Sequence, residues 1–216
     1  ATRRTIDHLY VPGGTAANHD HLGGTISRQD LVTMGAGDAR VSLRYAATPR
    51  LLVGAAVQLP TGRYRLTDET GGIGDPMIQP GSGSWGLAAT AQYGSSFPSL
   101  RITWAASVLA QRSLENGLGY RGGDEAYALA RLTRPVRGPV SAMLQGKAYH
   151  VGRSAFHGTA SPSTGSFALT VAPGVRVQAP GRVALYAIVQ APVFQHVNET
   201  QLGTHAVFQV GMSRAF

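Results

Sequence analysis

The last twelve residues of the chain, 205–216, alternate between two kinds of side chain. One parity is mostly apolar, with Phe208, Val210 and Met212 at its centre, and the other parity is small or polar. The chain ends on the aromatic Phe216. Strands that cross an outer membrane alternate lipid-facing and lumen-facing residues, and aromatic side chains mark the two membrane interfaces. The tail is therefore typical of the closing strand of an outer-membrane β-barrel, although the edge strand of a soluble β-sandwich alternates in the same way.

The rest of the chain repeats this alternation between turn residues. Residues 99–111 show it most clearly, because Leu100, Ile102, Trp104 and Val108 share one parity while polar or small residues dominate the other. Segments of this kind read as half-buried strands. In 124–133 and 182–192 the two faces cannot be told apart by composition. The pattern predicts nine strands, at residues 40–47, 50–59, 85–94, 99–111, 124–133, 139–149, 166–178, 182–192 and 205–216.

The connections between these segments alternate in length. Four are short, near residues 48–49, 94–98, 134–138 and 179–181, and the four between them are long and rich in Gly, Ser and Pro. Outer-membrane barrels have short periplasmic turns and longer extracellular loops. The sequence therefore predicts one all-β domain over residues 1–216, a transmembrane antiparallel up-and-down β-barrel of the bacterial outer membrane. Its C-terminus is expected in the periplasm.

Nine strands leave an odd count, whereas bacterial single-chain barrels have an even number. Residues 5–11 are the best tenth strand, rising from the periplasm to pair with 205–216. Residues 12–38 then form the first external loop. About ten strands are expected, and twelve is the alternative if upstream sequence or a hairpin inside 12–38 adds a pair.

Composition agrees with this fold and excludes several classes of protein. Charged residues are only 14% of the 216 residues, and 28 are glycine. No run approaches the eighteen apolar residues that a helical membrane span needs. The net charge is +8, but the basic residues lie singly along the chain with no run longer than Arg3-Arg4, so we expect no nucleic-acid partner. With no cysteine, the chain has no disulfides. The expected partner is outer-membrane lipid in a Gram-negative envelope.

Three motifs resemble those of one envelope family. Residues 34–38 read Met-Gly-Ala-Gly-Asp, residues 57–62 read Val-Gln-Leu-Pro-Thr-Gly, and residues 75–85 read Asp-Pro-Met-Ile-Gln-Pro-Gly-Ser-Gly-Ser-Trp. They are similar to the Gly-Asp, Leu-Pro-Thr-Gly and Gln-Pro-Gly-Thr-Gly-Ser-Trp stretches of the family labelled "MetA-pathway of phenol degradation". Ser82 stands where that family usually has Thr, and Gly86 where an acidic residue is common. The resemblance covers about residues 34–86 and implies an outer-membrane barrel of a family often described as transporters.

The polar parity of the predicted strands carries several basic and amide side chains. Such a lumen favours anions or polar solutes if water passes through it, which predicts a porin-like channel or uptake component for small solutes. Ten strands enclose little space, so a narrow lumen is expected. The alternative is a structural barrel whose extracellular loops dock an extracellular or envelope protein, or a metal-bearing assembly. The residues expected to face solute are Arg40, Arg44, Arg101, Lys147, Arg176, Gln92 and Gln145.

No cofactor and no enzymatic activity are expected. A Gly-X-Ser-X-Gly nucleophile elbow does not occur in the sequence. His19, Asp20 and His21 form a short cluster in the predicted first external loop, and imidazole with carboxylate suits Zn or Cu. His157 and His196 are expected in two other external loops, with His150 at a strand top. A weak metal site at His19, Asp20 and His21 follows as a further hypothesis.

Overall fold

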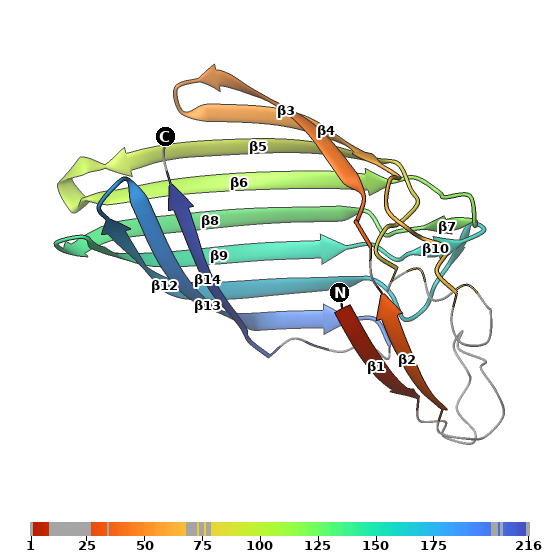
Figure 1. The fold of residues 1–216 in the computed structure, drawn as a ribbon. Coiled ribbons are helices and arrows are strands. Elements are labelled where there is room, and N and C mark those ends of the chain that lie inside the picture. Colours follow the sequence, from red (N-terminus) through yellow and green to blue (C-terminus); the bar gives the residue numbers. More distant parts are fainter. Residues whose placement is uncertain are drawn as a thin grey trace.

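Nine long antiparallel strands form one continuous sheet in the computed structural model (Figure 1). The structure describes residues 2–8, 27–33, 35–67, 73, 76, 79–199, 203 and 205–214. Phe216 and the cluster of His19, Asp20 and His21 lie outside these residues. The strands of the sheet are β3 (Ala39–Thr48), β4 (Leu51–Leu59), β5 (Gly86–Phe97), β6 (Ile102–Ser113), β8 (Glu125–Arg137), β9 (Val140–Val151), β12 (Ser166–Ala179), β13 (Val183–Val197) and β14 (Val207–Arg214).

Each of the nine predicted strands is present, and each pairs with its neighbours in chain order. The sheet order β14-β13-β12-β9-β8-β6-β5-β4-β3 is an up-and-down meander with no crossover. The four short connections all lie at one end of the strands, here called the turn end. The long connections lie at the opposite end, the loop end (Figure 1). The predicted all-β antiparallel up-and-down fold is therefore confirmed.

Local chemistry explains the tight turns. Gly138, between β8 and β9, has φ 53°, and Gly181, between β12 and β13, has φ 72°, conformations that glycine adopts without steric cost. Between β5 and β6, Pro98 begins a short 3-10 turn, Pro98–Leu100, which Arg101 closes with a left-handed backbone and an N–H donated to the Pro98 carbonyl at 3.1 Å. The strand expected from residue 99 therefore begins only at Ile102.

The N-terminal region differs from the prediction. β1 (Thr2–His8) pairs with β2 (Ser27–Thr33) in a separate two-stranded antiparallel sheet. Residues 27–33 were expected in a loop, and the tenth strand was expected to pair with 205–216. The prediction of that pairing is wrong, because β2 supplies the partner of β1. Among the residues that the structure describes, β3 and β14 are the two edges of the nine-stranded sheet.

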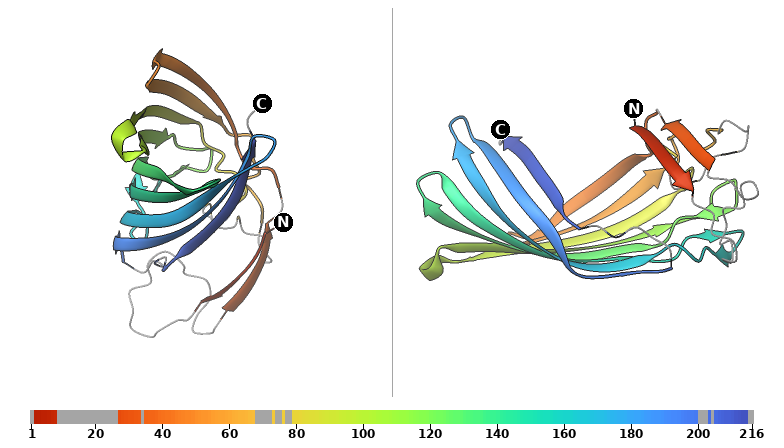
Figure 2. Two further views of the ribbon diagram at one scale, coloured as in Figure 1. Left: turned by 90° about the vertical axis from the view of Figure 1, so that its left-hand side faces the viewer. Right: turned by 90° about the horizontal axis from the view of Figure 1, so that it is seen from below.

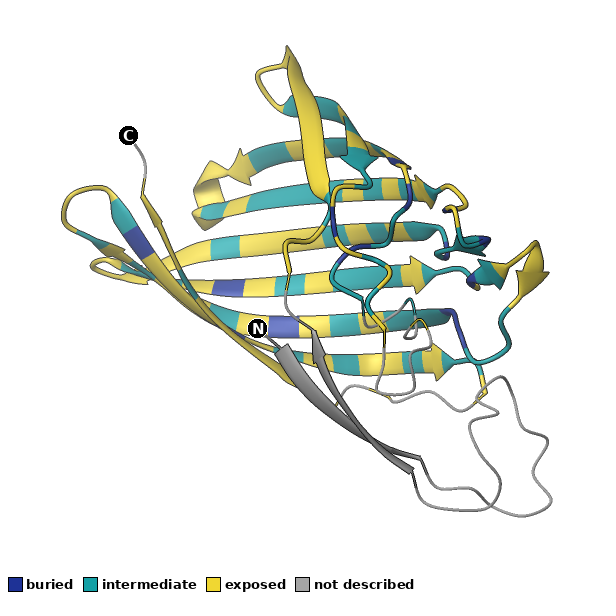
Figure 3. Ribbon diagram, turned by 45° about the vertical axis from the view of Figure 1, so that its right-hand side comes forward, coloured by how far each residue is buried: buried dark blue, intermediate teal, exposed yellow. Residues whose placement is uncertain are grey.

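The long sheet curves into an open trough (Figure 2). Few apolar side chains are buried: among the described residues they are Met143, Ala172, Ala184 and Ile188. By contrast, many large apolar side chains are exposed on the strands, including Leu43 at 77%, Phe208 at 77% and Val210 at 86%. Figure 3 shows that exposed residues recur along the strands of the sheet. In the described part of the chain, no helix is long and apolar enough to cross a membrane.

A small three-stranded sheet lies at the loop end (Figure 1). It consists of β11 (Thr159–Ala160), β10 (Ala155–Phe156) and β7 (Tyr120–Arg121), in that order. The Tyr120 hydroxyl lies 3.1 Å from the Ser154 hydroxyl and links the two loops that carry these short strands. The loop between β6 and β8 is therefore held against the loop between β9 and β12.

Candidate functional site: the concave face and the loop end

Register places the polar parity of all nine strands on one face of the sheet. Directly paired residues of antiparallel strands point to the same side. The pairing runs from Arg40 to Gln58 between β3 and β4, and from Gly86 to Ser113 between β5 and β6. It continues from Arg131 to Gln145 between β8 and β9. We call this the concave face, and the opposite side the outward face.

The contacts of Arg40 show that this face is the inside of the curve. Arg40 lies on β3, and its guanidinium donates hydrogen bonds to the Gln58 side chain at 3.4 Å and to the Gln111 side chain. Gln111 lies on β6, three strands away in the sheet order. A side chain can reach that far only across the hollow of a curved sheet. Arg40 therefore lies on the inside of the curved sheet.

Most of the other predicted interior residues share this face. Their register positions alternate with those of the exposed apolar side chains on the same strands. Arg101 is the exception, because it closes the β5–β6 turn instead of lying on a strand. The prediction that it faces the lumen from a strand is therefore corrected, while contact of any of these residues with a solute stays a prediction. The residues that share the concave face with Arg40 are Arg44, Gln92, Gln145, Lys147 and Arg176.

A hollow of about 610 Å³ lies on the concave face near the turn end. Two guanidinium-bearing residues, Arg131 and Arg176, line it together with the amides of Gln145 and Gln209. Thr103, Thr133, Ser213 and the half-exposed Tyr186 add hydroxyl groups, and no acidic residue is among those that line the hollow. Two cations beside neutral hydrogen-bonding groups form an environment that attracts anions.

Arg131 was not predicted as an interior residue. It lies in a segment whose faces the composition left ambiguous, since Tyr127 and Leu129 share its parity while alanines dominate the other. The register with β6 removes the ambiguity, because Arg131 pairs with Ala105, Leu129 with Ser107 and Tyr127 with Leu109. The assigned parity of the preceding strand was the signal that could have identified it.

A cationic side chain lies between two aromatic rings nearer the loop end. The Lys147 ammonium is 4.6 Å from the ring centroid of Tyr149 and 5.5 Å from that of Tyr127, which are cation–π distances. The Tyr149 hydroxyl donates a hydrogen bond to the Glu125 carboxylate at 3.0 Å. These contacts fix a positive charge on the concave face of β9, about midway along the strand.

The three motifs singled out in the sequence meet at the loop end, around Asp38. One carboxylate oxygen of Asp38 accepts hydrogen bonds from the backbone N–H of Ser82 at 2.8 Å, the Ser82 hydroxyl at 2.6 Å and the Gln58 amide at 3.2 Å. The other oxygen accepts the backbone N–H of Gly62 at 2.9 Å. Asn116, from the next loop, donates to the Ser82 carbonyl at 2.8 Å. We call this group, formed by Asp38, Gln58, Gly62, Ser82 and Asn116, the Asp38 clasp.

Burial and hydrogen bonding act in opposite directions on the Asp38 carboxyl. Partial burial disfavours the charged form and acts to raise the pKa. Hydrogen bonds from Ser82, Gly62 and Gln58 favour the charged form, and together they outweigh burial, so the pKa of Asp38 lies below its usual value. The ionised carboxylate is therefore the form that holds the three motifs together.

Two glycines of the motifs are required by a close backbone contact. A Cβ atom on Gly81 would lie 2.5 Å from the Cα and carbonyl carbon of Gly62, and one on Gly62 would lie 2.6 Å from the Cα of Gly81. All of these are backbone atoms, so the two loop segments that carry Gly62 and Gly81 would have to separate. The Leu-Pro-Thr-Gly and Gln-Pro-Gly-Ser motifs thus have glycine where the two loop segments touch.

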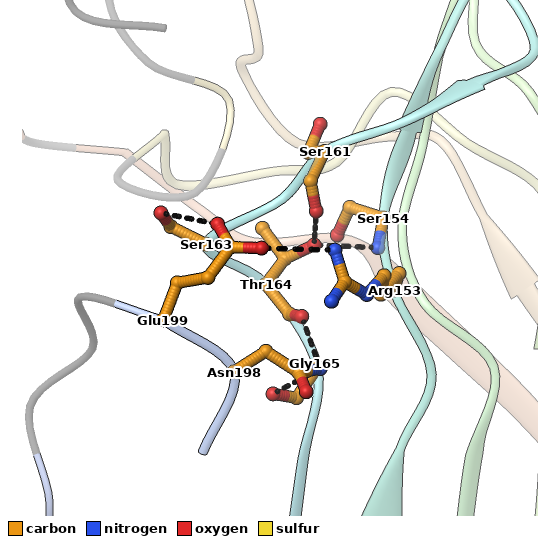
Figure 4. Close-up of polar contacts among 8 residues, drawn as sticks. All are labelled: Arg153, Ser154, Ser161, Ser163, Thr164, Gly165, Asn198 and Glu199. Carbon is orange, nitrogen blue, oxygen red and sulfur yellow. Dashed lines mark hydrogen bonds and ion pairs between the residues drawn. The ribbon is translucent and has the colours of Figure 1, made fainter. Parts of the chain in front are cut away.

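A second group of polar contacts joins the remaining two long loops (Figure 4). Arg153 forms an ion pair with Glu199 at 3.4 Å, and the Ser163 hydroxyl also contacts Glu199 at 3.4 Å. The Asn198 amide donates to the Thr164 carbonyl at 2.9 Å. These contacts bridge the β9–β12 loop and the β13–β14 loop. All four long loops of the sheet are thus engaged in polar contacts at the loop end.

The described histidines occupy separate structural positions. His150 and His196 lie on the outward face of β9 and β13, where both pair in register with Phe167. His196 was expected in an external loop, and that prediction is wrong because β13 extends to Val197. His157 lies in the loop end and its ring covers Gly119. In the described part of the chain, no group of three or more His, Cys, Asp or Glu residues could hold a metal ion.

Comparison with solved structures gives an informative likeness. No model of a protein family matches the sequence, and no curated protein matches it. Among solved structures, the chain is similar to the COG4313 outer membrane channel from Pseudomonas putida F1. The two share 14% sequence identity with a TM-score of 0.61, over 86% of this chain and 70% of that chain. The phenol-degradation family name stays a prediction from the motifs, and what the likeness shows is that this chain has the fold of an outer-membrane channel β-barrel.

Proposed function

We propose that the protein is an outer-membrane β-barrel that conducts small anionic solutes. The observation that carries this proposal is the reversed polarity of the sheet. Large apolar side chains lie exposed on the outward face while arginine, lysine and glutamine lie on the concave face. A soluble sheet would bury its apolar face, whereas a membrane barrel presents that face to lipid. The likeness to an outer membrane channel supports the same conclusion.

The concave face supports a preference for anions. Its basic residues are distributed from the loop end to the turn end, beginning at Arg40, continuing through Arg44 and Lys147, and ending at Arg131 and Arg176. On this face of the described strands, Glu125 is the single acidic residue, and it contacts Tyr149 near the loop end. A path lined by one sign of charge concentrates ions of the opposite sign.

Membrane orientation and closure belong to this proposal. Short turns face the periplasm in barrels of this class and long loops face outside. The turn end and the C-terminus are therefore assigned to the periplasmic side. In hydrocarbon, unpaired backbone groups of a sheet edge cost several kcal/mol each, so β3 and β14 require partners in the bilayer.

If the edge strands β3 and β14 have hydrogen-bonding partners in the bilayer, the backbone amides of β3 should be protected from hydrogen exchange. Backbone amides of β3, including those of Val41 and Leu43, are expected to exchange as slowly as those of the central strand β8 when the protein is in lipid vesicles. Exchange followed by mass spectrometry or NMR measures this. Rapid exchange of alternate β3 amides, with β8 protected, would show that this edge of the inserted sheet stays open.

Single-channel recording in planar bilayers tests the proposed conduction. The double variant Arg131→Gln and Arg176→Gln removes both positive charges from the 610 Å³ hollow. We expect the ratio of anion to cation permeability to fall several-fold at low salt, where charge screening is weakest. The matched control is Arg134→Gln, because Arg134 lies on the same strand but on the outward face. It should leave ion selectivity unchanged.

The outcome also separates the proposal from its alternative, a barrel that docks a partner through its loops. Ordered contacts at the loop end favour that second function, since the Asp38 clasp and the Arg153–Glu199 pair hold the loops in one arrangement. A correctly inserted protein that conducts no ions would contradict the channel and leave docking as the function of the barrel. Conduction with the same selectivity in wild type and double variant would contradict the assigned anion path.

A further inference from the structure

The charged residues of the sheet are segregated along the strands. Among the described side chains, every acidic residue lies at or near the loop end: Asp38, Glu115, Asp124, Glu125 and Glu199. At the turn end, in contrast, the described charged residues are all basic. Each of its four turns holds or adjoins at least one arginine, and a further arginine lies near the end of β14. We call this group the arginine belt, formed by Arg50, Arg101, Arg134, Arg137, Arg182 and Arg214.

All six arginines of the belt are exposed, and the register places Arg134 and Arg214 on the outward face of their strands. Arg134 pairs with Ala142, and Arg214 pairs with Val183, on the parity that carries the exposed apolar side chains. Their guanidinium groups therefore lie beside the apolar outward band at its turn-end border. A long arginine side chain at such a border can keep its stem on apolar surface while its charged group reaches the polar phase.

Aromatic side chains mark the same border independently. On the outward face of β5 and β6, the Trp104 ring lies 5.4 Å from the Tyr93 ring and 6.4 Å from the Phe97 ring, centroid to centroid. These residues lie within a few positions of the β5–β6 turn that Arg101 closes. Tryptophan and tyrosine are enriched at the level of the lipid headgroups. The belt thus lies directly beyond the level at which the hydrocarbon of a bilayer would end.

We propose that the arginine belt binds the phosphate groups of anionic phospholipids in the leaflet that surrounds the turn end. Arginine presents a planar set of donors that matches phosphate oxygens. The position next to an apolar band and an aromatic cluster favours a bilayer over a soluble partner, because a bilayer presents hydrocarbon and phosphate together. The inference that the arginine belt binds phospholipid rests on the membrane-barrel part of the proposed function, but it does not require the lumen to conduct.

Insertion into vesicles of defined composition tests the belt. The purified full-length protein is folded from denaturant into vesicles of phosphatidylcholine alone or of phosphatidylcholine mixed with phosphatidylglycerol, and insertion is followed by heat-modifiable gel mobility. A basic residue near an anionic surface contributes enough to change binding about five-fold at low salt. We expect wild type to bind and insert preferentially into the anionic vesicles. High salt should remove that preference.

Four turn arginines provide the variants. Changing Arg50, Arg101, Arg137 and Arg182 to Gln together should abolish the preference for anionic vesicles, whereas changing the same four to Lys should retain most of it. The matched control removes four charges at the loop end, by changing Arg63, Arg65, Arg112 and Arg121 to Gln, and should retain the preference.

Each outcome decides one part of the inference. If the wild-type protein inserts equally well into both kinds of vesicle, with no dependence on salt, the proposed binding of anionic phospholipid by the belt is wrong. The proposal of a membrane barrel is not affected by that result. Equal loss of preference in the turn-end and loop-end variants would overturn its location. A wild-type protein that inserts into neither vesicle would contradict the proposed membrane barrel itself. If the Gln variant does not fold, the Lys variant and the salt dependence of wild type still decide between these outcomes.

Discussion

Arginine in place of Val108 is expected to destabilise the membrane-inserted protein by about 2–4 kcal/mol, the cost of a basic residue on the lipid face at the midplane of a barrel. Val108 lies near the middle of β6, is 52% exposed and belongs to the outward face. Its register partners are Ala91 on β5 and Ala128 on β8, so the introduced guanidinium would have only small apolar neighbours. Either end of the strand is several residues away, which makes a polar contact costly to reach.

The adjacent residue offers the matched control. Ser107 lies on the concave face, where its register partners are Gln92 and Leu129. An arginine there can remain in water, so Ser107→Arg should change stability by less than about 1 kcal/mol. Reversible unfolding by guanidinium in vesicles measures both variants. A soluble protein whose outward face is covered by another layer of structure would also be destabilised by Val108→Arg. Such a protein, however, would unfold at the same guanidinium midpoint with and without lipid.

The nine strands of the sheet could be predicted from sequence because two independent patterns agree. Alternation of side-chain polarity identifies a strand with one face in lipid and one face in water, and connection length identifies the end at which two strands join. Errors at strand ends have local causes. Pro98 begins a 3-10 turn that shortens the expected β6 and moves Arg101 off the strand face.

The N-terminal hairpin could not be predicted in the same way. Residues 27–33 read Ser-Arg-Gln-Asp-Leu-Val-Thr, in which apolar residues gather at one end and do not alternate. The pattern that identified the other strands is therefore absent from β2. If residues 27–33 are a loop, β14 is the remaining candidate partner for residues 5–11, and this is why the predicted pairing of β1 is wrong.

The candidate sites also differ in how far the sequence predicts them, because one lies on strands and the other on loops. The concave face could be largely predicted, since strand parity determines the side on which Arg40, Arg44 and Arg176 lie. The Asp38 clasp could not, because its members are brought together by loops whose course no periodicity encodes. The three motifs can be recognised in the sequence. Only the structure shows that Asp38, in the first motif, accepts hydrogen bonds from Gly62 in the second and Ser82 in the third.

That clasp leads to the second large expected effect. Asp38→Asn should weaken the loop-end arrangement by about 2–3 kcal/mol, because a hydrogen bond to a charged group contributes about 1.5–3 kcal/mol and at least one is lost. An asparagine has a single acceptor oxygen. Its amide N–H₂ would face either the backbone N–H of Gly62 or the two Ser82 donors, all of which now donate to the carboxylate.

Trp85 provides a local probe, since it directly follows Ser84, which is buried beside Ser82. The sequence has two tryptophans, so Trp104→Phe leaves Trp85 as the sole indole. In that background, Asp38→Asn should shift the Trp85 emission and make the 60–84 loop sensitive to limited proteolysis. Glu115→Gln is the matched control, because Glu115 is an exposed residue at the same end and the change removes the same charge.

The dependence on pH follows from the lowered pKa of Asp38. A carboxyl whose pKa is lower in the folded state contributes stability that is complete above its ordinary pKa and is lost as the pH falls through the folded value. The Trp85 signal should therefore stay constant from neutral pH down to the ordinary range of aspartate and change only below it. Asp38→Asn should abolish this acid transition. If the variant retains the same transition, another carboxyl governs the loop end, and the role assigned to Asp38 is wrong.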